Sequence, residues 1–242
     1  MLDFASFAKL TEQGMMFSQS QASQFAKGIA GDFNPIHDVG GKRFCVPGDL
    51  LFASLLNRYG VYQRLHVDLV ALVSADVEVV LPNELSEENE IRDNKDRHLL
   101  SLNVSGESTD NQAFVSSLVM QYVRFSGKTF PDILVELMRK NNVMINPARP
   151  LVIYKDMSLI LERLQGDKLS LSLDNVTMEI DGKKGRVCLY FIIKSGDLII
   201  GRGEKNMLLS GLRGFDQLAM DNIVNQYAQW KSAYKAASLP LS

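Results

Sequence analysis

The chain has 242 residues, of which 46% are hydrophobic, and a formal net charge of −2 from 26 basic and 28 acidic side chains. This length and apolar content suffice for one large core or two modest ones without disulfide bonds. The basic residues are spread along the chain, which excludes the charge pattern of a nucleic-acid binder. No apolar run approaches the roughly 20 residues of a membrane span and no signal-peptide pattern opens the sequence, so we expect a cytoplasmic protein with no membrane partner.

Metal and cofactor motifs are missing from the sequence. Cys45 and Cys188 lie far apart, without a CxxC pair or a histidine at metal-ligand spacing, so no metal site is expected. The sequence also has no phosphate loop between a strand and a helix and no GxSxG elbow. We therefore expect no cofactor, and two thiols that lie in or near the core.

The first informative segment is a short predicted helix followed by a polar loop. Residues 18–29 predict a helix with a serine as N-cap. Gly31 suits the left-handed conformation that ends helices, and Pro35 prevents the helix from resuming. Asp32 and Asn34 can bond their own backbone in such a turn. Turn chemistry gives no reason, however, for His37.

A helix that is apolar on nearly every side is predicted next, within residues 46–65. Such a helix belongs in an interior. Strands are predicted at 67–81, 98–109 and 112–125, because these segments are rich in Val, Leu and aromatic residues with stretches of period-two alternation. The polar residues 82–97 are expected to form a solvated loop.

The second part of the chain predicts the same order again. A connecting helix at 130–142 precedes a heavily apolar segment, 151–164, which we interpret as a second buried helix. Three further strands then follow, at 168–180, 186–194 and 198–210. An amphipathic helix at 215–236 ends the sequence, and its apolar stripe is expected to pack over the second sheet.

One buried helix wrapped by an antiparallel sheet, occurring twice, is the hotdog architecture. The sequence thus predicts an α+β fold with two hotdog repeats, each a buried central helix wrapped by an antiparallel sheet, plus a C-terminal helix. Residues 1–142 would form an N-terminal hotdog with the polar loop. Residues 143–242 would form a degenerate C-terminal hotdog with the terminal helix.

The stretch QFAKGIAGDFNPIHD, residues 24–38, resembles the hydratase motif of the MaoC-like (R)-specific enoyl-CoA hydratases, a pattern of the form FAxxxGDxNPxH. The matching positions are Phe25, Ala26, Gly31, Asp32, Asn34, Pro35 and His37. In that family this loop also precedes the buried helix. The close match covers residues 18–57, and over its whole length the chain is also compatible with a family of uncharacterised bacterial proteins.

The resemblance implies roles for the motif residues. Asp32 and His37 would hold and activate the water that adds to a trans-2-enoyl thioester, with Asp32 as general base and acid. His37 would orient that water or share its proton. Positioned proton transfer of this kind contributes about 10² to 10⁴ in rate. Gly31, Asn34 and Pro35 would shape the loop.

The same reaction needs donors for the thioester oxygen, on which negative charge builds. Backbone amides at the start of the buried helix suit this role, since they are unpaired within the helix and carry the positive end of its dipole. The family usually has a His-Gly pair there, where this chain has Pro47, Gly48 and Asp49. Pairing the glycines makes Gly48 the donor. Pairing the Ala53-Ser54-Leu55 letters of the helix, which is the register that we prefer, makes Asp49 the donor and places Asn57 at a polar pocket position. In either register we expect the Asp49 carboxylate to cap the helix and compete with a substrate carbonyl.

The resemblance predicts an enoyl-CoA hydratase-like lyase that adds water to a trans-2-enoyl group carried by CoA or a carrier protein. Two alternatives stay open: a non-catalytic hotdog protein that binds an acyl thioester or another small ligand, and a hotdog thioesterase. The expected partner is a small-molecule acyl thioester. Hotdog sheets often pair between subunits, which favours a homodimer, whereas a chain with two repeats can satisfy that pairing internally.

Overall fold

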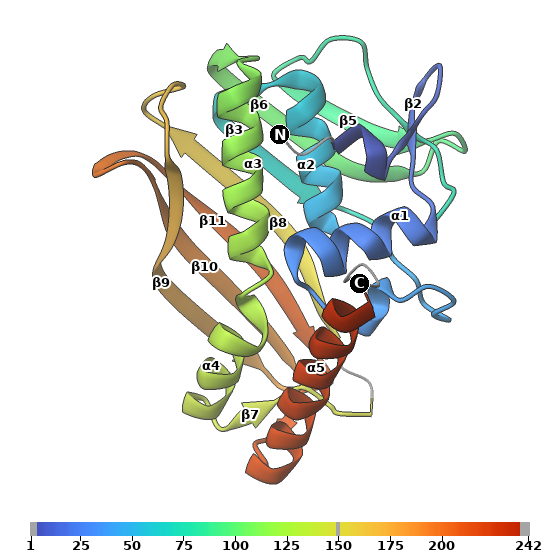
Figure 1. The fold of residues 1–242 in the computed structure, drawn as a ribbon, viewed down its shortest axis with the longest axis vertical. Coiled ribbons are helices and arrows are strands. Elements are labelled where there is room, and N and C mark those ends of the chain that lie inside the picture. The colour runs from blue at the N-terminus through green and yellow to red at the C-terminus, as the bar shows by residue number, and fades with distance from the viewer. Residues whose placement is uncertain (1–3, 149–150, 238–242) are drawn as a thin grey trace.

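A large antiparallel sheet forms the centre of the protein in this computed structural model, which describes residues 4–148 and 151–237 (Figure 1). Ten strands join in the order β1-β2-β4-β5-β6-β3-β8-β11-β10-β9. The strands of this sheet are β1 (Lys9–Leu10), β2 (Gly14–Met16), β3 (Val61–Leu69), β4 (Val79–Val80), β5 (Glu88–Asp93), β6 (His98–Thr109), β8 (Val152–Leu161), β9 (Leu169–Asp181), β10 (Lys184–Ser195) and β11 (Leu198–Ser210). A separate ribbon pairs β7 (Val143–Met144) with β12 (Arg213–Gly214).

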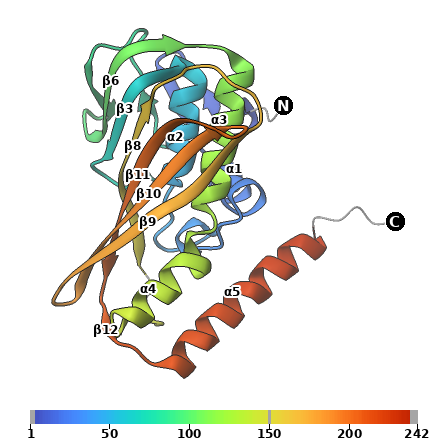
Figure 2. The ribbon, with the colours of Figure 1, turned by 90° about the vertical axis from the view of Figure 1, so that its left-hand side faces the viewer.

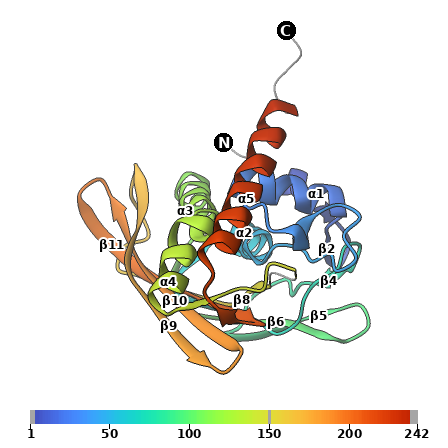
Figure 3. The ribbon, with the colours of Figure 1, turned by 90° about the horizontal axis from the view of Figure 1, so that it is seen from below.

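The helices gather on one face of this sheet (Figure 3). They are α1 (Gln19–Gln24), α2 (Gly48–Tyr59), α3 (Gln112–Ser126), α4 (Leu134–Lys140) and α5 (Gln217–Ala237). The curved sheet wraps around α2 and α3, which lie side by side in its hollow (Figure 2). Among the described residues, no helix is both long enough and apolar enough to span a membrane.

The core lies between the sheet and the two central helices. Every residue of α2 from Gly48 to Leu56 is buried, as its all-round apolar sequence predicts. Phe52 of α2 meets Tyr122 of α3 with ring centroids 4.6 Å apart, and Tyr122 in turn faces Phe191 of β10. Burying each such side chain stabilises the fold by about 1.5 to 3 kcal/mol, so these rings tie the helices to the sheet.

The two parts of the chain join at the centre of the sheet. β3 pairs with β8, for example Leu65 with Leu159 and Val67 with Met157. On one side of this pair α2 packs on the strands β3 to β6, and on the other side α3 packs on β8 to β11. The α+β fold of two hotdog repeats with a C-terminal helix is therefore confirmed. The division at residues 142 and 143 stays a prediction, since both parts share one sheet.

The second central helix is not where the sequence predicts it. Residues 112–125, predicted as a strand, form α3. Phe114, Leu118 and Tyr122 recur at every fourth position and are all buried, so the helical period of this segment decides its structure.

Residues 151–164, predicted as a buried helix, instead contain the strand β8. Met157, Leu159 and Leu161 alternate into the core, while Ile160 points outward. β8 bonds to β3 on one side and β11 on the other, and this central position explains its apolar sequence. The expected solvated loop at 82–97 likewise contains a strand, β5.

Candidate functional site

The motif loop begins where α1 ends. Ser18 caps α1 through a capping box with Gln21, and the helix continues as one π-helical stretch, Phe25–Ala30. Gly31 then takes the left-handed conformation, with φ of +74°, which reverses the chain. These features agree with the helix and the stop that the sequence predicts.

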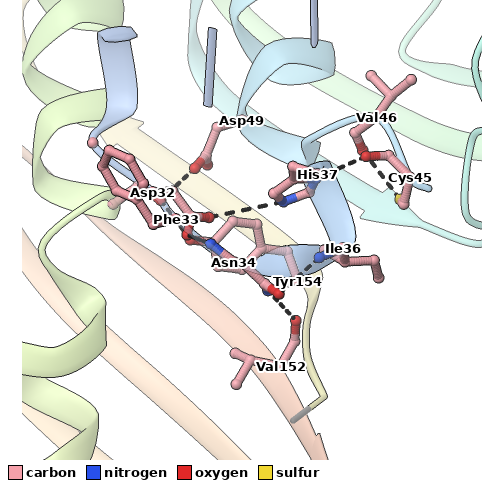
Figure 4. A network of polar contacts seen from close by, with 12 residues as sticks. Asp32, Phe33, Asn34, Ile36, His37, Cys45, Val46, Asp49, Val152 and Tyr154 are labelled. Atoms are coloured by element: carbon pink, nitrogen blue, oxygen red, sulfur yellow. Dashed lines mark hydrogen bonds and ion pairs between the residues drawn. The ribbon is translucent and has the colours of Figure 1, made fainter. Parts of the chain in front are cut away.

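Side chains of the loop hold its shape through their own backbone. The Asp32 carboxylate accepts a hydrogen bond from the N–H of Asn34 (2.9 Å), and the Asn34 side-chain oxygen accepts one from the N–H of Ile36 (3.2 Å). Pro35 opens a single 3-10 turn that ends at His37. Consecutive turns of this kind aim both Asp32 and His37 to one side of the loop (Figure 4).

Asp32 and His37 form a buried pair. The Nε2 atom of His37 lies 3.8 Å from a carboxylate oxygen of Asp32. His37 Nδ1 lies 2.7 Å from the carbonyl oxygen of Cys45, and because a carbonyl only accepts, Nδ1 carries the proton. In a neutral ring the Nε2 lone pair then faces Asp32. A separation of 3.8 Å is too long for a direct hydrogen bond but can be bridged by a water molecule.

The environment of Asp32 favours its protonated form. Burial raises the pKa of the Asp32 carboxyl, while His37 and the N–H of Asn34 act in the opposite direction. A carboxyl whose pKa is raised in this way can give up a proton as well as accept one. The pair therefore combines a basic nitrogen and a potential acid within reach of one water molecule.

A cavity of about 650 Å³ lies in front of this pair. Asp32, Asn34, Pro35 and His37 line it, and so does Gly48 at the first position of α2. Its apolar walls include Leu51, Leu69, Phe130, Val152, Met207 and Trp230. The start of α2 has no side-chain cap, so its amides and the Asp32–His37 pair meet at the same apolar space.

Gly48 is fitted closely to this position. A Cβ atom added there would lie 2.6 Å from Leu69 Cδ1 and 3.4 Å from the ring of Tyr154. A side chain at this position would therefore collide with Leu69 and press on Tyr154, both of which also line the cavity.

The Asp49 carboxylate does not cap α2, which corrects the sequence prediction. It instead accepts a hydrogen bond from Lys205 of β11, with 2.7 Å between Nζ and the carboxylate oxygen. Ser126, the last residue of α3, donates to the other carboxylate oxygen and accepts from Lys205. Asp49 therefore leaves the helix amides unblocked.

This buried ionic cluster was not anticipated from the sequence. Lys205 has no exposed surface, and its Nζ lies 3.2 Å from the ring centroid of Tyr154. Burial lowers the pKa of Lys205, whereas the neighbouring Asp49 carboxylate acts to raise it. Lys205 stands 156 positions from Asp49, so only the pairing of distant strands brings them together.

The remaining predicted residues lie outside the cavity. Asn57 sits on the later part of α2, half-buried, and is not among the lining residues. Gly31 and Asp49 are not among the lining residues either. Of the two donors considered, the structure therefore brings Gly48, rather than Asp49, to the cavity surface.

Tyr227 of α5 is a site residue that the sequence analysis missed. Its hydroxyl accepts a hydrogen bond from the N–H of Phe33 (3.0 Å) and donates one to the carbonyl of Gly31 (3.1 Å). These two bonds hold the backbone on both sides of Asp32. The sequence predicts that α5 packs over the second sheet, and the structure adds a contact of this helix with the motif loop (Figure 3). The sequence does show an apolar stripe on this helix, but the stripe alone does not indicate which part of the protein the helix contacts.

The fold and the site together define a double-hotdog protein in which an Asp–His pair and the uncapped start of a central helix line one cavity. The chain belongs to the family described as a protein of unknown function (DUF3581), whose model matches residues 2–218. No curated protein matches the sequence. The resemblance of residues 24–38 to the MaoC-like hydratases stays a prediction, because this family description names no activity.

Two solved structures resemble the chain at low identity. Acyl-CoA thioesterase II TesB2 of Mycobacterium marinum is 10% identical with a TM-score of 0.40, and the match covers 70% of this chain and 91% of that one. A tesB protein of Mycobacterium avium subs paratuberculosis is 9% identical with a TM-score of 0.42, and the match covers 85% of this chain and 97% of that one.

Proposed function

We propose that the cavity binds an acyl thioester and that Asp32 and His37 activate one water molecule for attack on it. One observation carries this proposal: the Asp–His pair and the uncapped start of α2 line the same apolar cavity. The acyl chain would lie against the apolar walls. The thioester oxygen would lie at the N–H of Gly48, where helix amides stabilise developing negative charge.

Hydration of a 2-enoyl thioester is the reaction that this pair serves best. The oxygen of water bonds to Cβ, and its proton passes to Nε2 of His37. The electrons of the double bond move to Cα and the thioester oxygen, and Cα takes the proton of the Asp32 carboxyl. His37 then returns a proton to Asp32 through the next water. The raised pKa of Asp32 supports the acid role, because burial shifts this carboxyl toward its protonated form.

Hydrolysis of the thioester is the second candidate. The same pair can direct water at the carbonyl carbon, whose oxygen would lie at Gly48 in both reactions. The C–S bond then breaks, and the thiolate leaves with the proton that water lost. The Mycobacterium marinum protein is likewise named as an acyl-CoA thioesterase.

One assay separates these reactions. Purified protein is mixed with crotonyl-CoA while the enoyl absorbance is followed, and with butyryl-CoA and octanoyl-CoA while free thiol is followed. Loss of enoyl absorbance without thiol release indicates hydration, whereas thiol release indicates hydrolysis. Thioester binding without turnover would contradict water activation and leave a binding protein.

Matched variants connect either activity to the site. Asp32→Asn and His37→Ala are expected to lower turnover by about 10² to 10⁴. Asp38→Asn is the control for the first, since Asp38 pairs with Lys27 away from the cavity lining. His98→Ala is the control for the second, because His98 lies on β6 and bonds Ser101. Equal losses in the control and site variants would contradict the proposal.

A further inference from the structure

Helix α5 supplies one wall of the cavity. Ile223, Gln226, Tyr227 and Trp230 all line it, at the spacing of one helix face. The opposite wall comes from strands of the sheet, with Val152 on β8 among the lining residues. An apolar ligand in the cavity would therefore lie between α5 and the sheet.

Helix α5 is held in two ways: Met220 joins the core, where Ile223 also packs, and Tyr227 contacts the motif loop. Among its described residues only Met220 and Tyr227 are buried. Tyr227 combines its two hydrogen bonds to the loop with edge-to-face contacts on Phe33 (5.7 Å) and Phe130 (5.2 Å between ring centroids). Tyr234 adds a further edge-to-face contact on Phe33. These contacts fix the height of the helix above the cavity.

Next to this contact, α5 places along the cavity two apolar side chains that are only partly buried. Trp230 is 40% exposed although it lines the cavity, and Ile223 is half-buried. A large aromatic side chain left open at the edge of an apolar cavity gains by covering its surface with a ligand. Leu218 offers a contrast, because it is 72% exposed on the same helix and does not line the cavity.

We propose that α5 is the wall that determines which acyl chains the cavity accepts, with Ile223 and Trp230 as the residues that contact the chain. The inference rests on the proposed acyl-thioester function but not on the reaction. Side chains at these two positions set the free space between α5 and the sheet. Long acyl chains reach them and short ones do not.

The binding test uses CoA thioethers, which have no thioester carbonyl and no double bond in the alkyl chain and so undergo neither hydration nor thioester hydrolysis. S-Butyl-, S-octyl- and S-dodecyl-CoA are titrated into the full chain, and affinity is measured by calorimetry. Trp230 is the single tryptophan of the sequence, so its fluorescence reports contact at α5 directly. We expect its emission to change with the long thioethers and to stay constant with S-butyl-CoA.

A pair of variants then tests the wall itself. Ile223→Phe fills the space at α5 and should weaken binding of S-dodecyl-CoA about tenfold or more, because overpacking an apolar site is costly. Binding of S-butyl-CoA should be unchanged. Leu218→Phe makes the same kind of change on the same helix outside the cavity and should leave both affinities as in the wild type. Both variants keep Trp230 as the single tryptophan.

The outcomes separate this inference from the proposed function. Binding with a Trp230 response but no turnover of any thioester would refute water activation and support the α5 wall. Binding without a Trp230 response, or equal effects of Ile223→Phe and Leu218→Phe, would refute the wall and leave the proposed function standing. No binding of any thioether would refute the wall, and together with no turnover of any thioester it would overturn both.

Discussion

The two central helices begin in opposite ways. Asn111 caps α3, and its side-chain oxygen accepts hydrogen bonds from the N–H groups of Ala113 and Phe114, each 3.1 Å long, at an exposed position. The start of α2 is buried, has no side-chain cap and lies at the cavity. At a capped helix start the side-chain cap accepts hydrogen bonds from the free N–H groups. At an uncapped start beside a cavity these N–H groups are available to a ligand.

The other end of α3 adds to this difference. Ser126 closes α3 next to Asp49, so the end of one central helix meets the start of the other. Ser126 and Lys205 both donate hydrogen bonds to the Asp49 carboxylate, which is therefore not available to cap α2. These polar side chains therefore leave the start of α2 without a side-chain cap.

Breaking the cluster should have the largest effect on stability. Lys205→Met leaves the buried Asp49 carboxylate without its partner and should lower the free energy of unfolding by about 3 to 5 kcal/mol. Urea denaturation measures the change. The double variant Asp49→Asn/Lys205→Met should be more stable than Lys205→Met alone, because it leaves no unpaired buried charge.

Lys155→Met is the matched control for that prediction. Lys155 pairs with Asp68 where both side chains are more than a third exposed, at 40% and 35%. Removing it should cost about 0 to 1 kcal/mol. A similar loss for Lys155→Met and Lys205→Met would contradict the structural role of the buried pair.

Removing the hydroxyl of Tyr227 should have an intermediate effect. Tyr227→Phe keeps the ring contacts but leaves the buried N–H of Phe33 without its acceptor, at a cost of about 1 to 3 kcal/mol. Turnover should fall about tenfold as Asp32 loses its fixed position. Thermal unfolding and steady-state kinetics measure the two effects. Tyr190→Phe on the exposed β10 surface is the control, and an equal loss there would count against Tyr227.

Removing the cap of α3 should have a smaller effect and leave the site intact. Asn111→Ala should lower the free energy of unfolding by about 1 kcal/mol, because two amides lose their acceptor. Thioester turnover and thioether affinity should not change. Lower affinity in this variant would show that the two helix starts are not independent, contrary to the comparison above.

The smallest expected effect is a pH-dependent one at Asp32, since His37 and the N–H of Asn34 offset part of the effect of burial. A raised pKa means that the folded state holds a proton that the unfolded state releases. Stability therefore falls as pH rises from the ordinary aspartate pKa through the raised one. Asp32→Asn escapes this loss, so it should be more stable than the wild type at neutral pH.

Unfolding temperatures of both proteins across acidic and neutral pH measure this difference. It should shrink as pH falls below the ordinary pKa of aspartate, where both states are protonated. A difference that stays constant with pH, or favours the wild type at neutral pH, would contradict the assigned environment of Asp32.

The motif loop could be predicted from the sequence because its shape is local. Gly31, Asn34 and Pro35 act on backbone groups within two or three positions, and such turn chemistry is visible in the letters. The strands 98–109 and 198–210 were likewise predicted at their observed bounds, because strand residues and hairpin turns agree there.

The exchange of helix and strand in the middle of the chain shows where local information ends. α3 is rich in Val and aromatic residues, which favour strands, yet packing against α2 and β9 selects the helix. β8 is apolar enough for a buried helix, and its place between β3 and β11 makes it a strand. Lys205 and Tyr227 were missed for the same reason, since their partners are far away in the sequence.

The central claim, that Asp32 and His37 activate water for attack on an acyl thioester, can be tested by following the oxygen atom of water. The wild type and Asp32→Asn are incubated with crotonyl-CoA and octanoyl-CoA in water labelled with heavy oxygen, and the products are examined by mass spectrometry. We predict label at Cβ of the hydroxyacyl product for hydration, or in the released carboxylate for hydrolysis, and a loss of either in Asp32→Asn. Label that is absent from all products, or that enters equally with Asp32→Asn, would contradict the claim.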